Sequence, residues 1–222
     1  METVVKENVV NVEKPSIFGM ITAPTHQFER MKEKAPIALP LIIMLILTSI
    51  TGAIVAYVGL NNPIFKDLPT PIEIPAAFTV GMGTVGAIIG GVARFFVVAA
   101  FYKLCMVFMG NDTPYMKLFA VVLYSSLIMS VGVLINGLIS LAVSGYEVYY
   151  TSIAPLMGDN QMLKLIASNF DIFHIWYYVV LGMGLKVVAG LSKSKVITLV
   201  VVIFLLGVAL SSLGGLIPTF GA

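Results

Sequence analysis

Charged side chains are scarce in this sequence, and their scarcity excludes most classes of soluble protein. Lysine, arginine, aspartate and glutamate together make up 11% of the 222 residues, whereas 59% are hydrophobic and the mean hydropathy is +1.00. Soluble domains are typically about 45–50% apolar. The basic residues are dispersed among apolar runs and form no dense patch, which argues against nucleic-acid binding. The composition predicts an integral membrane protein.

Cysteine and histidine are also too few for most metal or disulfide chemistry. The chain has one cysteine, Cys105, so it cannot form an intrachain disulfide. A Cys/His metal site would need Cys105, His26 and His174, which are far apart in the sequence, and we predict no metal site. The sequence has no nucleophile elbow, zinc-protease helix, phosphate-binding lysine loop or dinucleotide-binding glycine motif. We therefore predict a protein that is not an enzyme and needs no cofactor.

Long apolar runs, by contrast, are abundant, and they predict an all-α fold, a polytopic membrane helix bundle with five transmembrane helices. About 20 helical residues cross the roughly 30 Å hydrocarbon core of a bilayer. The predicted spans are about 36–60, 81–109, 118–144, 171–191 and 196–217. The fourth is the least regular, because only fourteen residues separate Asp171 from Lys186.

Residues 1–35 precede the predicted transmembrane domain, which extends over 36–217. The first fifteen residues are polar and contain no apolar stretch typical of a signal peptide. From Thr25 the sequence favours a short amphipathic helix with Phe28 and Met31 on one side. We expect this helix to lie at the membrane surface, as an anchoring flank or as a docking element for a partner.

The distribution of basic residues predicts a cytoplasmic N-terminus and an external C-terminus. With five spans, the outer side has only Lys66 and Lys164. The flanks on the inner side hold Lys6, Lys14, Arg30, Lys32, Lys34, Lys103, Lys117, Lys186, Lys193 and Lys195. Since lysine and arginine concentrate in cytoplasmic loops, this asymmetry favours the N-in, C-out orientation. The Asn111-Asp-Thr sequon then falls in a cytoplasmic turn and should not be glycosylated.

The second span, from Gly81 to Met109, is glycine-rich and contains Arg94 in its middle. A guanidinium near the bilayer centre costs from about 2.5 to over 10 kcal/mol, so it needs a polar partner. Gly86, Gly90 and Gly91 precede Arg94 at spacings that allow another helix to approach closely, and they form a predicted helix-packing face. We expect the other spans to pack around this helix.

Asp171 and His174, one helical turn apart at the outer start of the fourth span, are the partners predicted for Arg94. Glu73, Glu147 and Asp159 are further acidic residues on the outer side. The functional interpretation of Arg94, Asp171 and His174 is an intramembrane ion or proton-linked site. The structural interpretation, which a lone charge pair favours, is an ion pair or a carbonyl clamp that fixes helix packing.

Three segments in a fixed order resemble the Yip family, the Ypt-interacting membrane proteins. They are a proline-flanked Phe28 segment running into Pro36 and Pro40, the turn Gly110-Asn-Asp-Thr-Pro-Tyr-Met-Lys-Leu-Phe119, and Ile175-Trp176 followed by Gly182-Met-Gly-Leu185. The resemblance covers about residues 16–200. It implies five transmembrane helices, a cytoplasmic N-terminus and no enzymatic activity.

Eukaryotic members of the Yip family bind Rab-type GTPases, and some bacterial members accompany ABC-type efflux systems. The tail of this chain is short and lacks the Asp-Leu-Tyr-Gly-Pro-type motif of the eukaryotic members. This departure argues against Rab binding and favours a multi-pass protein of a bacterial cell membrane.

Two functional hypotheses follow. The first is a membrane adaptor that helps to assemble or regulate another membrane complex, with an ABC-type exporter as the candidate; its partners are the lipid bilayer and that complex. The alternative is a small self-contained transporter or channel that uses Arg94 and the outer-side acids. The absence of a visible inverted repeat weakens the alternative. A homo-oligomer is left open.

Overall fold

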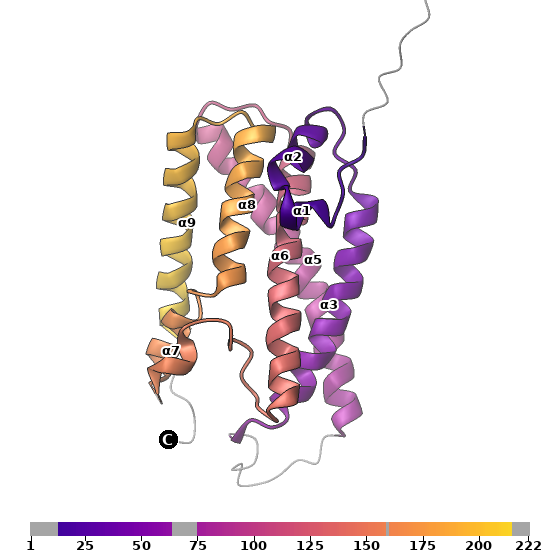
Figure 1. Ribbon diagram of the computed structural model, residues 1–222, viewed down its shortest axis with the longest axis vertical. Helices are drawn as coiled ribbons and strands as arrows, with labels where there is room; N and C mark the ends of the chain where they lie inside the picture. Colours follow the sequence, from indigo (N-terminus) through magenta and orange to yellow (C-terminus); the bar gives the residue numbers. More distant parts are fainter. Residues whose placement is uncertain (1–12, 64–74, 159, 215–222) are drawn as a thin grey trace, which may run out of the picture.

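The computed structural model is a bundle of long helices (Figure 1). It describes residues 13–63, 75–158 and 160–214, and in these ranges it contains helices and no strand beyond one isolated bridge between Ser152 and Asp171. The membrane-length or near-length helices are α3 (Ala38–Gly59), α5 (Ala76–Phe108), α6 (Tyr115–Ala142), α8 (Ile172–Val188) and α9 (Lys193–Gly214). The prediction of an all-α bundle is thus confirmed. Four of these helices are long and apolar enough to cross a membrane, and α8 is an apolar helix of 17 residues.

Short helices cover the two ends of the bundle. One end, named here the α2 end, carries α1 (Gly19–Thr22), α2 (Pro24–Glu33) and the turns that follow α5 and α8 (Figure 1). The other, the α7 end, carries η1 (Ala154–Met157) and α7 (Gln161–Ala167). The described chain enters at the α2 end and leaves at the α7 end, as an odd number of antiparallel long helices requires.

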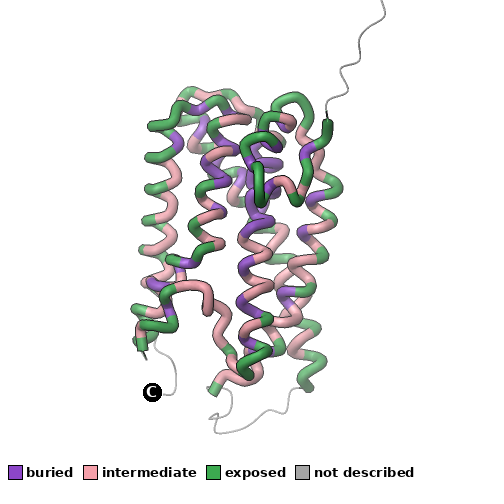
Figure 2. The backbone as a smooth tube through the Cα atoms, viewed as in Figure 1, coloured by how far each residue is buried: buried purple, intermediate pink, exposed green. Residues whose placement is uncertain are grey.

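The helix at the centre of the bundle is α6, so the expectation that the other spans pack around the Arg94 helix was wrong. In the most apolar stretch of α6, 67% of the residues are buried, against 11% in α5 and 6% in α9. Figure 2 shows the buried positions concentrated on α6 and near α2. α6 contacts α3, α5 and α8, whereas α5 contacts α3 and α6 along one side. Glycine content misled the prediction because small residues permit close contact without determining how many neighbours a helix has.

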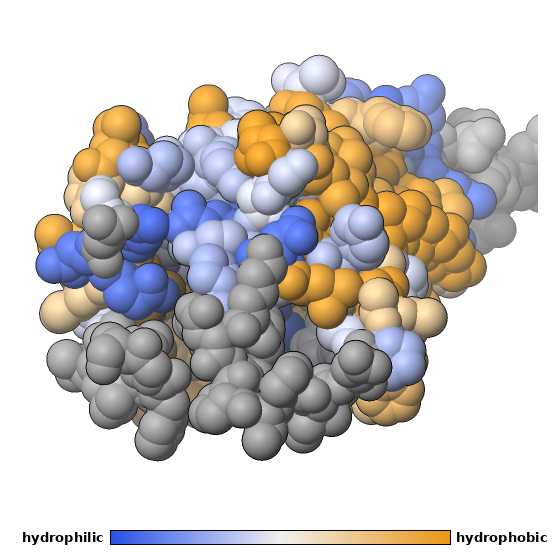
Figure 3. Space-filling model, turned by 90° about the horizontal axis from the view of Figure 1, so that it is seen from below, coloured by the Kyte–Doolittle hydropathy of each residue, from blue (hydrophilic) through white to orange (hydrophobic). Residues whose placement is uncertain are grey.

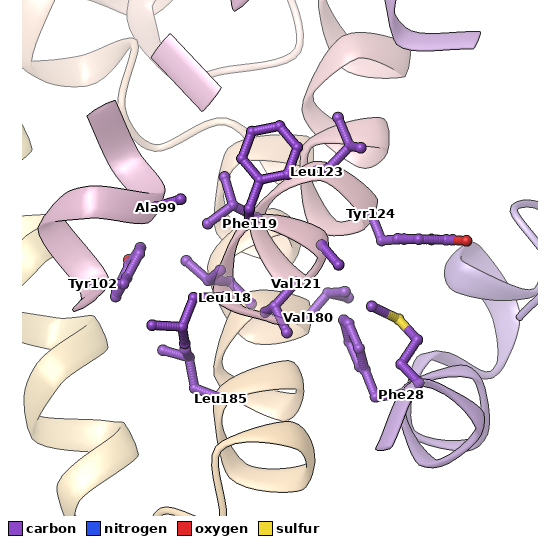
Figure 4. Packing of buried hydrophobic residues seen from close by; sticks show 14 of the residues in the cluster. Phe28, Ala99, Tyr102, Leu118, Phe119, Val121, Leu123, Tyr124, Val180 and Leu185 are labelled. Atoms are coloured by element: carbon purple, nitrogen blue, oxygen red, sulfur yellow. The ribbon is translucent and has the colours of Figure 1, made fainter. Parts of the chain in front are cut away.

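The apolar side of α2 packs into the bundle. Phe28 and Met31 are fully buried, and α2 lies against α8. A Cβ built on Gly184 of α8 would lie 2.9 Å from Cε1 of Phe28 and 2.6 Å from Cγ1 of Val121 on α6, so glycine is needed for this three-helix contact. Figure 4 shows Phe28 directed toward Val121 and Val180. The amphipathic pattern of α2 therefore reflects a protein contact as well as any contact with the membrane.

A tight turn joins α5 to α6 and ties both to α8. Gly110, at φ 69°, allows the backbone N–H of Asn111 to donate to the Met106 carbonyl at 2.9 Å, which ends α5 in a glycine-dependent cap. The Asn111 side chain donates to the Ala189 carbonyl at 2.8 Å and accepts from the Thr113 backbone N–H at 3.0 Å. Asn111, the asparagine of the sequon, thus holds the turn against the end of α8.

Candidate intramembrane polar site

Arg94 lines a cavity of about 290 Å³ between α3, α5 and α6. Four hydroxyl side chains share this cavity: Thr48 and Thr51 from α3, and Ser126 and Ser130 from α6. The Thr51 hydroxyl donates to the Leu47 carbonyl of its own helix, as hydroxyls in apolar helices commonly do. The cavity is therefore lined by small polar groups on a background of apolar residues.

The guanidinium of Arg94 has only a weak partner within the described part of the chain. Its Nη2 lies 3.0 Å from the sulfur of Met129 on α6, and no ion pair joins it to any described acid. His174, Tyr177 and Tyr178 of α8 are close enough to interact with its charge. A thioether is a poor acceptor, so most of the donor capacity of this arginine is unused.

A second cavity, of about 260 Å³, holds the two residues predicted to be the partners of Arg94. Asp171 and His174 line it together with Asn136 of α6, Asn169 and Ser211 of α9. Met129 and Val133 line both cavities, so these two side chains separate the Arg94 cavity from the Asp171 cavity. The imidazole of His174 also stacks on the ring of Tyr178, with a centroid separation of 5.1 Å.

The carboxylate of Asp171 is engaged by neighbouring groups. Its Oδ1 accepts from the backbone N–H groups of Phe173 at 2.8 Å and His174 at 3.1 Å, so it caps the N-terminus of α8. Its Oδ2 accepts from the Thr151 hydroxyl. An Arg94–Asp171 ion pair is absent from the described structure, because the capping geometry holds the carboxylate on the far side of Met129.

Asn136 completes a polar network that sequence reasoning did not find. Its amide nitrogen donates to the Thr151 hydroxyl at 2.6 Å and to the Gly132 carbonyl at 3.0 Å, and its Oδ1 accepts from the Thr151 backbone N–H at 2.9 Å. The sequence marks Asn136 as a polar residue in an apolar run. Thr151, in the loop between α6 and α7, has no signal that identifies it as the partner.

The predicted packing face of glycines divides into two parts. A Cβ on Gly91 would lie 3.1 Å from Cγ2 of Thr48, so Gly91 faces α3. A Cβ on Gly86 or Gly90 would meet no atom within 4 Å, and both residues are exposed. Gly86 therefore lies on a face of α5 that the bundle does not cover, and Gly90, which also lines the Arg94 cavity, lies at the edge of that face.

Polar groups at the α7 end are paired with one another. Glu147, one of the outer-side acids, accepts from the ammonium group of Lys164 at 2.7 Å. That hydrogen bond raises the pKa of Lys164, and burial raises the pKa of nearby Tyr149. Figure 3 shows hydrophilic residues in the middle of this end with apolar residues on its flanks. Glu73 and Asp159 lie outside the described residues.

The described residues contain no group of three histidine, cysteine, aspartate or glutamate side chains suited to hold a metal ion.

Comparison with known proteins assigns the chain to a protein family. The Yip1 domain model matches residues 18–215. The chain belongs to the Yip1 family. It is 35% identical to the membrane protein YknW of Bacillus subtilis over 226 aligned positions, which cover 98% of this chain and 97% of the relative. No solved structure matches the chain significantly.

Proposed function

We propose that this Yip1-family protein is a non-enzymatic adaptor of the bacterial cell membrane that assists the assembly or regulation of another membrane complex. The uncovered face of α5, with Arg94 beside Gly86 and Gly90, supports this proposal most strongly. A guanidinium at membrane depth with one thioether contact is costly for the isolated chain. A partner helix that contributes a carboxylate would remove that cost.

The glycines beside Arg94 would allow such a helix to come close. Small residues spaced by four let helix backbones approach within packing distance in lipid. Because no described atom lies within 4 Å of a Cβ at Gly86 or Gly90, the space for a partner helix already exists. The N-terminus is cytoplasmic in this proposal, and the α2 end faces the cytoplasm. For the complex itself we propose an ABC-type exporter, on the basis of the family resemblance.

The test is co-purification from the native membrane, in a mild detergent, followed by quantitative mass spectrometry of the retained membrane proteins. We expect a stoichiometric partner with the wild-type chain and at least a tenfold loss of it with Gly86→Leu/Gly90→Leu and with Arg94→Ala. Gly81→Leu is the matched control, since Gly81 is also an exposed α5 glycine with open space around its Cβ position but lies on the opposite side of the helix from Gly90.

Equal partner recovery with all these variants, or equal loss with Gly81→Leu, contradicts the adaptor proposal. A partner acid can be located by a charge reversal. If Arg94→Glu loses the partner and a lysine or arginine at one partner aspartate or glutamate restores it, the two residues form the proposed ion pair.

The second candidate is a small self-contained transporter or channel, and the two adjoining cavities favour it. The Arg94 cavity and the Asp171 cavity are both lined by polar groups and are separated by Met129 and Val133. Purified protein in liposomes should then support substrate flux without any partner, and Arg94→Ala should abolish that flux while the fold persists. A chain that is inactive alone but recovers a stoichiometric partner supports the adaptor.

A further inference from the structure

An apolar groove of about 440 Å³ lies between α8 and α9, away from Arg94 and the open face of α5. Tyr178, Val179 and Gly182 form part of its α8 wall, and Ile197 and Val201 part of its α9 wall. Lys186 and Lys193 line the end of the groove that is nearest the α8–α9 turn. The groove therefore has an apolar body and a single positively charged end.

The two groove lysines differ in their hydrogen bonding from three lysines that lie in or beside the turns at the α2 end. Lys103, Lys117 and Lys195 donate to the backbone carbonyls of Thr113, Lys32 and Met109 respectively. The ammonium groups of Lys186 and Lys193 form no hydrogen bond and no ion pair with a described residue, and both residues are exposed. Their ammonium groups are free to bind an anion from outside the chain.

The start of α9 increases the positive potential at this end. α9 begins with Lys193, which lines the groove, and it has no acidic residue in its first turn. The N-terminus of a helix carries a partial positive charge and free N–H groups, and it normally attracts an acidic side chain. Here Lys193 occupies that position and Ser192 Oγ accepts from the Lys195 backbone N–H at 3.4 Å, so no acidic side chain of the first turn offsets the positive charge beside the groove.

We propose that the groove between α8 and α9 binds one anionic phospholipid, with its phosphate between Lys186 and Lys193 and an acyl chain along the apolar walls. Lys186 lies two residues before the end of α8, and Lys193 is the first residue of α9. Both lysines are thus at the level where a spanning helix meets the headgroups. A phospholipid supplies the anion and the apolar chain at matching depths, and basic pockets between helices are known to take such headgroups. The site is independent of the adaptor proposal.

Native mass spectrometry of the full chain tests this site. The protein is released from nanodiscs that contain equal amounts of phosphatidylglycerol and phosphatidylcholine with matched acyl chains, and the lipids retained are counted. We expect the wild type to retain one phosphatidylglycerol in preference to phosphatidylcholine. We expect Lys186→Gln/Lys193→Gln to lower that preference by about fivefold for each lysine.

Two further variants separate a site from general attraction to charge. Lys186→Arg/Lys193→Arg keeps both charges and should keep the preference. Lys195→Gln removes an exposed charge from the same turn without touching the groove, and it should leave the preference unchanged.

Equal retention of the two lipids by the wild type overturns the proposal, as does an equal loss with Lys195→Gln. If the paired glutamine variant instead loses a co-purified protein with no change in lipid preference, the groove binds a protein helix and the phospholipid site does not exist. Thermal unfolding of each variant in the same detergent checks that the fold is intact.

Discussion

α5 and α6 are both long and apolar, but α6 lies at the centre of the bundle and α5 lies at its edge. The most apolar stretches have mean hydropathies of 1.9 and 2.4, yet 11% of the residues are buried in the one and 67% in the other. In water, such a difference in burial would follow from composition. In lipid, an apolar side chain gains little by moving from acyl chains to a protein interior, so the number of helical neighbours is set by packing and polar contacts.

Polar residues in the two helices show the same contrast. Asn136 of α6 has its amide groups satisfied by Thr151 and Gly132. Arg94 of α5 has a single thioether contact. The polar residue of α6 is thus satisfied within the chain, whereas most donors of the polar residue of α5 have no partner among the described residues.

Leucine substitutions at glycine should show the largest difference between the two positions. Gly184→Leu on α8 forces a side chain into Val121 of α6 and Phe28, so we expect the free energy of unfolding to fall by about 1–3 kcal/mol. Gly86→Leu on α5 meets open space and should change it by less than about 0.5 kcal/mol. Reversible unfolding in mixed detergent micelles measures both. Equal destabilisation would show that Gly86 is covered as completely as Gly184.

Removal of the polar side chains should have the next largest effect. Asn136→Ala leaves the Thr151 backbone N–H without its acceptor in a partly buried site, and we expect a loss of about 1 kcal/mol in the free energy of unfolding. Arg94→Ala should leave the value unchanged or raise it, because the monomer no longer holds an unpaired charge.

Hydrogen exchange of the Thr151 amide provides a local readout of the first variant. Exchange should be faster in Asn136→Ala than in the wild type, and unchanged in Arg94→Ala. A large destabilisation by Arg94→Ala would mean that Arg94 has a structural role within the chain, and it would remove the main support for the adaptor proposal.

The ion pair at the α7 end, outside both helices, should have the smallest effect. The hydrogen bond to Glu147 raises the pKa of Lys164 in the folded chain, so the pair contributes fully below the unfolded lysine value of about 10.4. Its contribution, up to about 1 kcal/mol, should be lost as the pH rises through the higher pKa of the folded state. Thermal unfolding at pH 8 and pH 11.5 measures this loss. In Glu147→Gln, the loss of thermal stability between pH 8 and pH 11.5 should be smaller by the contribution of this ion pair. If the loss is the same as in the wild type, it does not come from the pair.

The sequence by itself determined that this is an all-α membrane protein of the Yip1 family with several apolar helices, because composition and run length report directly on the solvent that a helix requires. It also pointed to Arg94 as a charged residue in the middle of an apolar run. Only the tertiary structure decided which helix is central, which glycines remain open, and that Asp171 caps α8 and binds Thr151 without reaching Arg94. Those outcomes depend on contacts between residues far apart in the chain, and in lipid no hydrophobic gradient marks in the sequence which face of an apolar helix will be buried.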